Sequence, residues 1–222
     1  MRQNTVDILT PAQLPEAARL LAAGQIVAVP TPRWYMLCVR AADPAATSTV
    51  FRVKQRRVTK PLMLLIKSRA TAAALFDLSG DARLLAGQLW PGDLALRLPW
   101  KPDAQPIAAV GSPALVGCPA GLLGQLITLA GEPLAAAACS ISTPAASDAD
   151  RPALTAGQVA DFERTSKAGI AAVVDDGICP QSHHMTIVDC PAGAEARLRR
   201  KGTVHPRALE AALAPAGGQH VG

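Results

Sequence analysis

The side chains best suited to chemistry in this sequence are basic and lie close together. Between Pro44 and Phe76 there is no Asp or Glu, while seven basic residues occur there: Arg52, Lys54, Arg56, Arg57, Lys60, Lys67 and Arg69. Like charges without counter-charges repel one another unless solvent or an anion lies among them. Lys and Arg are also the side chains that stabilise phosphate charge. The stretch indicates either an anion-binding site or a solvated helix end whose cations complement the helix dipole.

Several motifs that would define another chemistry are absent. The sequence holds no G-x-x-x-x-G-K-[ST], no G-x-G-x-x-G and no G-x-S-x-G, which excludes a P-loop, a Rossmann fingerprint and a nucleophile elbow. His183 and His184 lie near Cys179, Asp175 and Asp176, a set that would permit a metal ion. Adjacent histidines in a loop rarely point at one ion, so we expect a solvated loop and no metal site.

Composition indicates a cytoplasmic protein with a large core and anionic partners. Half of the 222 residues are hydrophobic but only 3% are aromatic, which suits helices packed on a sheet. The net charge is +5 and the pI about 9.2, a balance that favours nucleotides, RNA or acidic surfaces. The five cysteines are odd in number and form no C-x-x-C, so we expect reduced, mostly buried thiols. Prolines and glycines interrupt the uncharged stretch over 104–131, so we expect no membrane span.

Apolar patterns and capping residues predict alternating helices and strands. Helices are expected after Thr10, over 44–54, after Ser68, after Ser79, and over 119–131, 158–164 and 206–213. Strands are expected over 26–29, 35–39, 62–66, 94–98, 114–118, 134–138, 171–174, 186–188 and 197–201, and a loop over 140–151. This order predicts a single α/β domain over 8–205, with a twisted mixed parallel/antiparallel sheet and flanking helices. A C-terminal helix and a disordered tail are expected over 206–222.

Short motifs lie in a fixed order along most of the chain. They read P-T-P-R-W-Y-M-L-C over 30–38, K-Q-R over 54–56, K-P-L over 60–62, W-P-G-D-L-A over 90–95 and M-T-I-V-D over 185–189. This set resembles P-T-E-T-x-Y-G-L-G, K-x-R, K-P-L, W-P-G-P-L-T and S-T-I-V-D of the YrdC/YciO family, which includes the threonylcarbamoyl-AMP synthases. The resemblance covers residues 10–204 and, with it, an anion-binding site is favoured over a solvated helix end.

The resemblance implies a set of site residues and a reaction. The family joins ATP, as a substrate that can carry Mg²⁺, with threonine and bicarbonate in the tRNA t6A modification pathway, and no tightly bound cofactor is expected. Lys54 and Arg56 correspond to the catalytic cations. The matching substrate- or nucleotide-binding positions are Thr31, Arg33, Tyr35, Lys60, Ser140 and Thr186. We expect Lys54, Arg56, Lys60 and Thr31 to line one concave basic face.

Departures from the family pattern predict an eroded nucleotide site. Gly117 stands where a strand ending V-R-x-P carries an Arg for the nucleotide phosphates, and 136–140 reads A-A-A-C-S in place of S-T-S-A-N. No Lys or Arg lies between Lys101 and Arg151 to replace that Arg. We expect threonylcarbamoyl-AMP synthesis to be absent or strongly reduced. Two alternatives stay open: a non-catalytic protein of the same fold that binds nucleotide or double-stranded RNA, and an enzyme that forms another carbamoyl- or acyl-adenylate, for which Arg33 is a new cation.

Overall fold

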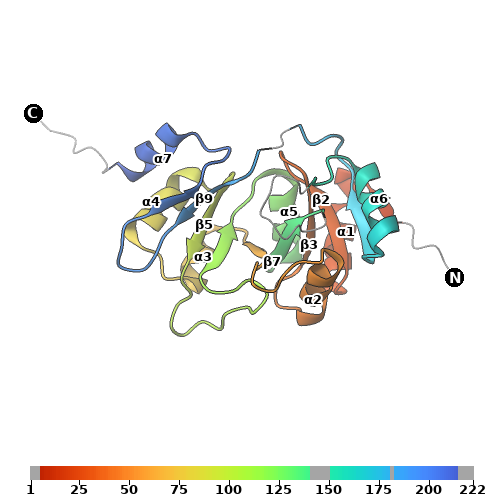
Figure 1. Ribbon diagram of the computed structural model, residues 1–222, viewed down its shortest axis with the longest axis horizontal. Coiled ribbons are helices and arrows are strands. Elements are labelled where there is room, and N and C mark those ends of the chain that lie inside the picture. Colours follow the sequence, from red (N-terminus) through yellow and green to blue (C-terminus); the bar gives the residue numbers. More distant parts are fainter. Residues whose placement is uncertain (1–5, 141–150, 181–182, 215–222) are drawn as a thin grey trace, which may run out of the picture.

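The fold is one long mixed sheet with helices on both faces (Figure 1). The protein is described by a computed structural model that covers residues 6–140, 151–180 and 183–214. In these ranges, ten strands form a single sheet in the order β1-β8-β2-β3-β7-β4-β6-β5-β9-β10. Neighbouring strands are parallel in β1–β8, β8–β2, β4–β6 and β5–β9 and antiparallel in the other pairs. The sheet is therefore mixed, as the alternation of elements predicts.

The described residues contain ten strands and seven α-helices. The strands are β1 Asp7–Leu9, β2 Ile26–Pro30, β3 Tyr35–Arg40, β4 Met63–Leu65, β5 Leu94–Leu98, β6 Ala114–Gly117, β7 Leu134–Ala138, β8 Ile170–Val174, β9 Thr186–Asp189 and β10 Arg197–Arg200. The helices are α1 Leu14–Ala22, which follows a short 3-10 turn, α2 Pro44–Val53, α3 Arg69–Leu75, α4 Gly80–Leu89, α5 Gly121–Ala130, α6 Ala156–Ser166 and α7 Pro206–Leu213.

Side chains at alternate strand positions point to opposite faces of the sheet, and each face has its own hydrophobic core. On one face, α2, α3, α4, α6 and α7 pack against a core that includes Leu37, Leu64, Leu96 and Val116. On the other face, α1 and α5 pack together over Val27, Met36, Leu65 and Ala136. This second pair of helices covers only the half of the sheet that carries β2, β3, β7 and β8 (Figure 1). The other half of that face holds a small apolar cluster of Ala95, Met185 and Ile187, edged by Met63 and Leu115.

Most predicted elements are confirmed, because their local signals are strong. The Asp43 carboxylate accepts hydrogen bonds from the amides of Ala45 and Ala46 at 2.9 and 3.0 Å. Ser68 and Ser79 cap α3 and α4 in the same manner. Gly131, with φ of 74°, ends α5 as expected. The helix expected from Pro119 begins later, at Gly121, because residue Ala120 is extended.

Two other elements differ from the expectation. The three-residue strand β1 is absent from the prediction; it pairs with β8 in parallel and is too short to show a periodicity. The strand expected over 62–66 is shorter, although the amides of Leu62 and Ile66 still bond to Ala109 and Gly117. The predicted loop over 140–151 and the disordered tail lie largely outside the described residues. The final helix α7 packs on α4 and places Leu209 and Ala212 in the main core.

The cysteine side chains and the helices can be compared with two expectations from composition. All five cysteines are free and buried, which confirms their use as small apolar side chains. Burial raises the pKa of the Cys38, Cys139 and Cys190 thiols to about 12. Among the described helices, none combines the length and the apolar content that crossing a bilayer requires.

Candidate functional site

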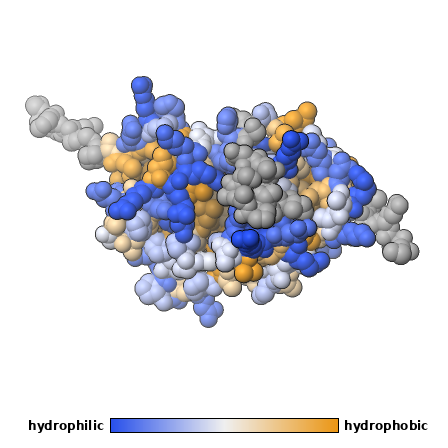
Figure 2. Space-filling model, in the orientation of Figure 1, coloured by the Kyte–Doolittle hydropathy of each residue, from blue (hydrophilic) through white to orange (hydrophobic). Residues whose placement is uncertain are grey.

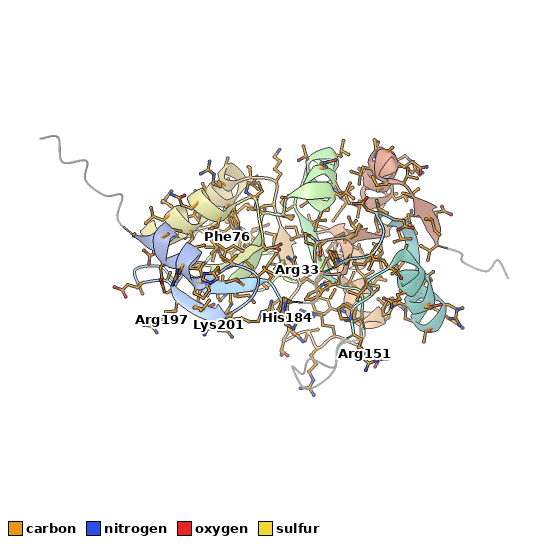
Figure 3. The ribbon with its side chains drawn as sticks, turned by 90° about the horizontal axis from the view of Figure 1, so that it is seen from above. Arg33, Phe76, Arg151, His184, Arg197 and Lys201 are labelled. Atoms are coloured by element: carbon orange, nitrogen blue, oxygen red, sulfur yellow. The ribbon has the colours of Figure 1, made fainter. Side chains whose placement is uncertain are left out.

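A cavity of about 780 Å³ lies near the centre of the molecule, and its described lining contains Lys and Arg but no Asp or Glu. We call it the basic cavity. Its described lining consists of Trp34, Lys54, Arg56, Ala138, Ser140, Arg151, Pro152, Leu154, Gln158, His183, His184, Lys201 and Gly202. Figure 3 shows His184 near the centre, with Arg151 on one side and Lys201 on the other. Cations from segments far apart in the sequence therefore converge on one space.

The end of α2 positions two of these cations. Gln55 has a left-handed φ of 49°, and its amide bonds to the Arg52 carbonyl at 3.1 Å while the Arg56 amide bonds to the Phe51 carbonyl at 2.9 Å. These two bonds form a Schellman motif, which satisfies the last carbonyls of the helix and reverses the chain. Lys54 and Arg56 consequently flank one tight turn, and both line the basic cavity.

Lys54 is a buried cation held by the end of β7. Its side chain is 1% exposed, and Nζ donates to the Ala138 carbonyl at 2.6 Å and to the Ser140 carbonyl. The Ser140 hydroxyl lies 3.4 Å from the same Nζ. A buried ammonium group needs hydrogen-bond acceptors, and these carbonyls both supply them and fix the position of Lys54.

Arg56 closes the loop that follows it. Its Nε donates to the Lys60 carbonyl at 2.6 Å and its Nη2 to the Pro61 carbonyl at 2.7 Å. The K-P-L motif thus takes part in holding Arg56 at the cavity wall. The Lys60 side chain is exposed and lies outside the described lining.

Arg151 reaches the basic cavity because the segment after it is pinned to the sheet. The Ala153 amide donates to the Cys139 carbonyl at 2.9 Å, and the Ala153 carbonyl accepts from the Tyr35 amide at 2.8 Å. These bonds extend the pairing of β3 and β7 beyond their ends. Arg151 is therefore held at the wall of the basic cavity, on the other side of His184 from Lys201.

Lys201 reaches the basic cavity through a close contact of two backbones. The Thr203 amide bonds to the His184 carbonyl at 3.1 Å, and the Val204 amide bonds to the Thr186 hydroxyl at 3.0 Å. A Cβ at Gly202 would lie 2.5 Å from backbone atoms of Met185 and Thr186. The segment can approach β9 this closely only because residue 202 is glycine.

The basic cavity is suited to an anion. Lys54, Arg56, Arg151 and Lys201 contribute four cations, and the described lining contains no Asp or Glu. Figure 2 shows hydrophilic surface across the middle of this face, with apolar surface between the hydrophilic groups. A concave surface lined by charges of one sign focuses its field and concentrates ligands of the opposite sign. Phosphate groups fit this charge best.

The remaining predicted site residues lie outside the described lining of the basic cavity. Thr31 is buried, and its hydroxyl donates to the Trp34 carbonyl at 2.7 Å and accepts from the Arg33 and Trp34 amides, so it closes the turn after β2. Tyr35 is fully buried, and its hydroxyl donates to the Gly177 carbonyl at 3.0 Å. Burial and then the charge of Asp175 raise the pKa of Tyr35. Thr186 is buried and holds Val204, as described above.

Arg33 is a buried arginine that forms a partly buried ion pair close to the basic cavity. It is 5% exposed, and its Nη1 donates to the carboxylate of Asp93. Its guanidinium also lies 5.8 Å from the ring centre of Trp34. The Trp34 ring meets His184 edge-on at 5.3 Å. Figure 3 shows Arg33 beside His184 at the centre of the molecule.

The surroundings of Gly117 are apolar. A Cβ at this position would lie 3.4 Å from Leu65 and 3.5 Å from the Met63 sulfur. Gly117, the last residue of β6, is paired with Ala95 of β5, which belongs to the small apolar cluster. Where the family pattern has an Arg, a Thr and a Ser, this chain has Gly117, Ala95 and Met185.

The lining residues that sequence reasoning missed include Arg151, Lys201, His183 and His184. The two cations belong to no motif and are far from Lys54 in the sequence, so spacing offers no signal for them. The histidines were recognised only as a loop that could permit a metal ion. Within the residues that the structure describes, no group of three or more His, Cys, Asp or Glu side chains could hold a metal.

Comparisons with known proteins agree with the motifs. The model of the Sua5/YciO/YrdC family, described as telomere recombination, matches residues 19–202. The chain is 30% identical to the threonylcarbamoyl-AMP synthase of Bacillus subtilis over 91% of this chain and 57% of that protein. It is 32% identical to that of Alkalilimnicola ehrlichii over 82% of this chain and 93% of that protein. The chain therefore belongs to the Sua5/YciO/YrdC family.

Solved structures show the same fold. Sua5 of Pyrococcus abyssi in complex with L-threonine is 25% identical, with a TM-score of 0.80 over 94% of this chain and 60% of that chain. YciO of E. coli has a TM-score of 0.72 at 15% identity, over 94% of this chain and all of YciO. The chain thus spans 57–60% of the length of the Bacillus synthase and the Pyrococcus protein.

Proposed function

We propose that this chain binds the phosphates of ATP in the basic cavity and forms threonylcarbamoyl-AMP at a strongly reduced rate. The observation that carries the proposal is the convergence of Lys54, Arg56, Arg151 and Lys201 on one cavity beside Ser140. The synthases named among the relatives of this chain support the choice of reaction.

The reaction needs charge and position more than a reactive side chain. Threonine and bicarbonate condense to a carbamate with loss of water. A carbamate oxygen then attacks the α-phosphorus of ATP, the bond to the β-phosphate bridging oxygen breaks, and pyrophosphate leaves. Cations that stabilise the phosphate oxygens lower the barrier of such transfers. Since the described lining has no carboxylate to bind Mg²⁺, the ion would enter with ATP.

Two features support a reduced rate. Gly117 places no guanidinium against the ligand and faces Leu65 and Met63. The end of β7 presents Ala136, Ala137 and Ala138, which offer no side-chain hydrogen bonds. Each lost charge-assisted hydrogen bond removes about 1.5–3 kcal/mol, which is about one to two decades in affinity. Arg151 and Lys201 supply positive charge in place of the Arg that the family pattern has at position 117, but they supply it from other positions in the cavity.

The test is pyrophosphate release with ATP, threonine and bicarbonate, with the Bacillus subtilis synthase assayed in parallel. We expect a rate at least about tenfold below that of the synthase. A Gly117→Arg variant should gain activity, because the flexible Met63 side chain can give way to the new side chain. Gly80→Arg, on the exposed start of α4, is the control for added charge and should leave the rate unchanged. Turnover of the wild-type chain at the rate of the synthase would contradict the proposal.

A second candidate function is binding of double-stranded RNA by its backbone. The supporting observation is the edge strand β10, in which Arg197, Arg199 and Arg200 are exposed and lead to Lys201 at the basic cavity. Arg197 also lines a second cavity of about 360 Å³ with Arg97. Such a surface would contact the phosphates of a duplex. Binding by base stacking is not expected, because the chain has few aromatic side chains.

A further inference from the structure

Two departures from the family pattern meet in one ion pair. Arg33 stands where the pattern P-T-E-T has its second Thr, and Asp93 stands where W-P-G-P has its second Pro. The two residues are 60 positions apart, yet the Arg33 guanidinium donates to the Asp93 carboxylate. The arginine side chain is 6% exposed and the aspartate side chain 30%. The buried guanidinium of Arg33 is thus paired with the carboxylate of Asp93, which is still partly exposed to solvent.

A second guanidinium lies beside this pair. Leu94 is in register with Thr186, and Asp93 and Met185 are the residues that precede this first pair of β5 and β9. The Nε atom of Arg200 donates to the Met185 carbonyl at 3.1 Å. Partial burial of its guanidinium and then the charge of Arg33 lower the pKa of Arg200. Arg200 is therefore a second positive charge near Arg33.

The location of the pair is suited to a ligand. The Trp34 ring lies against the Arg33 guanidinium and also lines the basic cavity with His184. A guanidinium offers five N–H donors in a planar fork that matches a carboxylate, and the ion pair of Arg33 with Asp93 is made through Nη1. Asp93 belongs to a turn before β5 and is partly exposed, so an incoming carboxylate can compete with it.

We propose that Arg33, with Arg200 beside it, forms a subsite for the carboxylate of a small acid, and that Asp93 occupies this subsite until the acid displaces it. The inference deepens the proposed function, since it assigns the carboxylate end of the second substrate to Arg33 and its reacting end to the basic cavity. Binding at Arg33 does not require turnover, so the subsite can be tested apart from the reaction.

The first experiment is calorimetric titration with L-threonine and with L-threoninol, which carries an alcohol in place of the carboxylate. Removing the competing charge in Asp93→Asn should tighten threonine binding about tenfold. Arg33→Met should abolish it, and threoninol should respond to neither change. The control is Glu132→Gln, which removes the carboxylate partner of Arg40 outside the subsite and should leave threonine binding unchanged. Equal or weaker threonine binding by Asp93→Asn overturns the proposal, as does an equal gain for threoninol.

A second measurement covers the case in which Asp93→Asn is unstable, because a buried cation without its partner destabilises a fold. Sodium acetate should then raise the melting temperature of Asp93→Asn more than sodium chloride does, because acetate fills the vacated place on Arg33. The wild-type chain and Glu132→Gln should show no such difference. Identical shifts in acetate and chloride for Asp93→Asn would refute the subsite, whatever the outcome of the pyrophosphate assay.

Discussion

At the scale of single residues, Lys54 is a buried cation whose position is fixed by backbone carbonyls. Its Nζ is surrounded by the Ala138 and Ser140 carbonyls and the Ser140 hydroxyl, which solvate the ammonium in place of water. Such an arrangement tolerates a buried charge only where its hydrogen bonds are made. Because Lys54 lines the basic cavity, its ammonium group is placed to attract a phosphate there.

Replacing Lys54 with Met should weaken the binding of inorganic pyrophosphate by about 10- to 100-fold, since one charge-assisted contact is lost. The measurement is calorimetric titration at constant ionic strength. Lys67→Met removes an exposed lysine from the same acid-free stretch, outside the described cavity lining, and should bind like the wild type. Pyrophosphate binding unaffected by Lys54→Met would remove Lys54 from the site.

At the scale of elements, the ends of strands and helices position the cations. The Schellman motif after α2 places Lys54 and Arg56, and the pairing of Ala153 beyond β3 and β7 places Arg151. The segment after β10 lies against β9 through Thr186 and Gly202 and places Lys201. The cavity therefore depends on backbone contacts at positions that carry no charge themselves.

Gly202→Ala tests this dependence on the backbone. The new methyl group would overlap backbone atoms of His184, Met185 and Thr186, so we expect a loss of about 1–3 kcal/mol in unfolding free energy. Chemical denaturation is the measurement, with pyrophosphate binding as a second readout that should also weaken as Lys201 shifts.

The matched control is Gly80→Ala at the start of α4, where a Cβ meets nothing within 4 Å. This change should be neutral or stabilise the fold by up to about 1 kcal/mol. Gly202→Ala that is as stable as Gly80→Ala would show that β9 does not restrict the segment.

At the scale of the whole molecule, the sheet separates two kinds of surface. Helices α1 and α5 cover one half of one face, while the half with β5, β9 and β10 carries arginines around a small apolar cluster. With a net charge of +5, the molecule attracts polyanions in general. Phosphate attraction of this kind is electrostatic and does not depend on sequence.

Binding of double-stranded RNA, measured by titration over a range of salt, should accordingly be weak and salt-dependent. Two to four phosphate contacts predict a loss of about 10- to 100-fold in affinity between 50 and 200 mM salt. Arg197→Ala on β10 should lower the salt slope by about one. Arg164→Ala, whose guanidinium pairs with Asp161 on α6, should not. Affinity that is insensitive to salt would contradict an electrostatic footprint.

The sequence by itself determined the local elements and one half of the candidate site. Asp43, Ser68 and Ser79 mark helix starts because a capping side chain bonds to amides only two or three residues away. The sequence also predicted that Lys54 and Arg56 lie together, because they are only two residues apart at the end of one helix. Runs of hydrophobic residues predicted the long strands correctly, because a strand buried on both faces needs apolar side chains at successive positions.

Only the tertiary structure decided what lies opposite those cations. Strand β1, the cavity position of Arg151 and Lys201, and the pairing of Arg33 with Asp93 all depend on hydrogen bonds or charges between residues remote in the chain. The sequence separation of such partners carries no periodic signal. They meet because the order of strands in the sheet, and not the order of residues in the chain, determines which strand ends share a space.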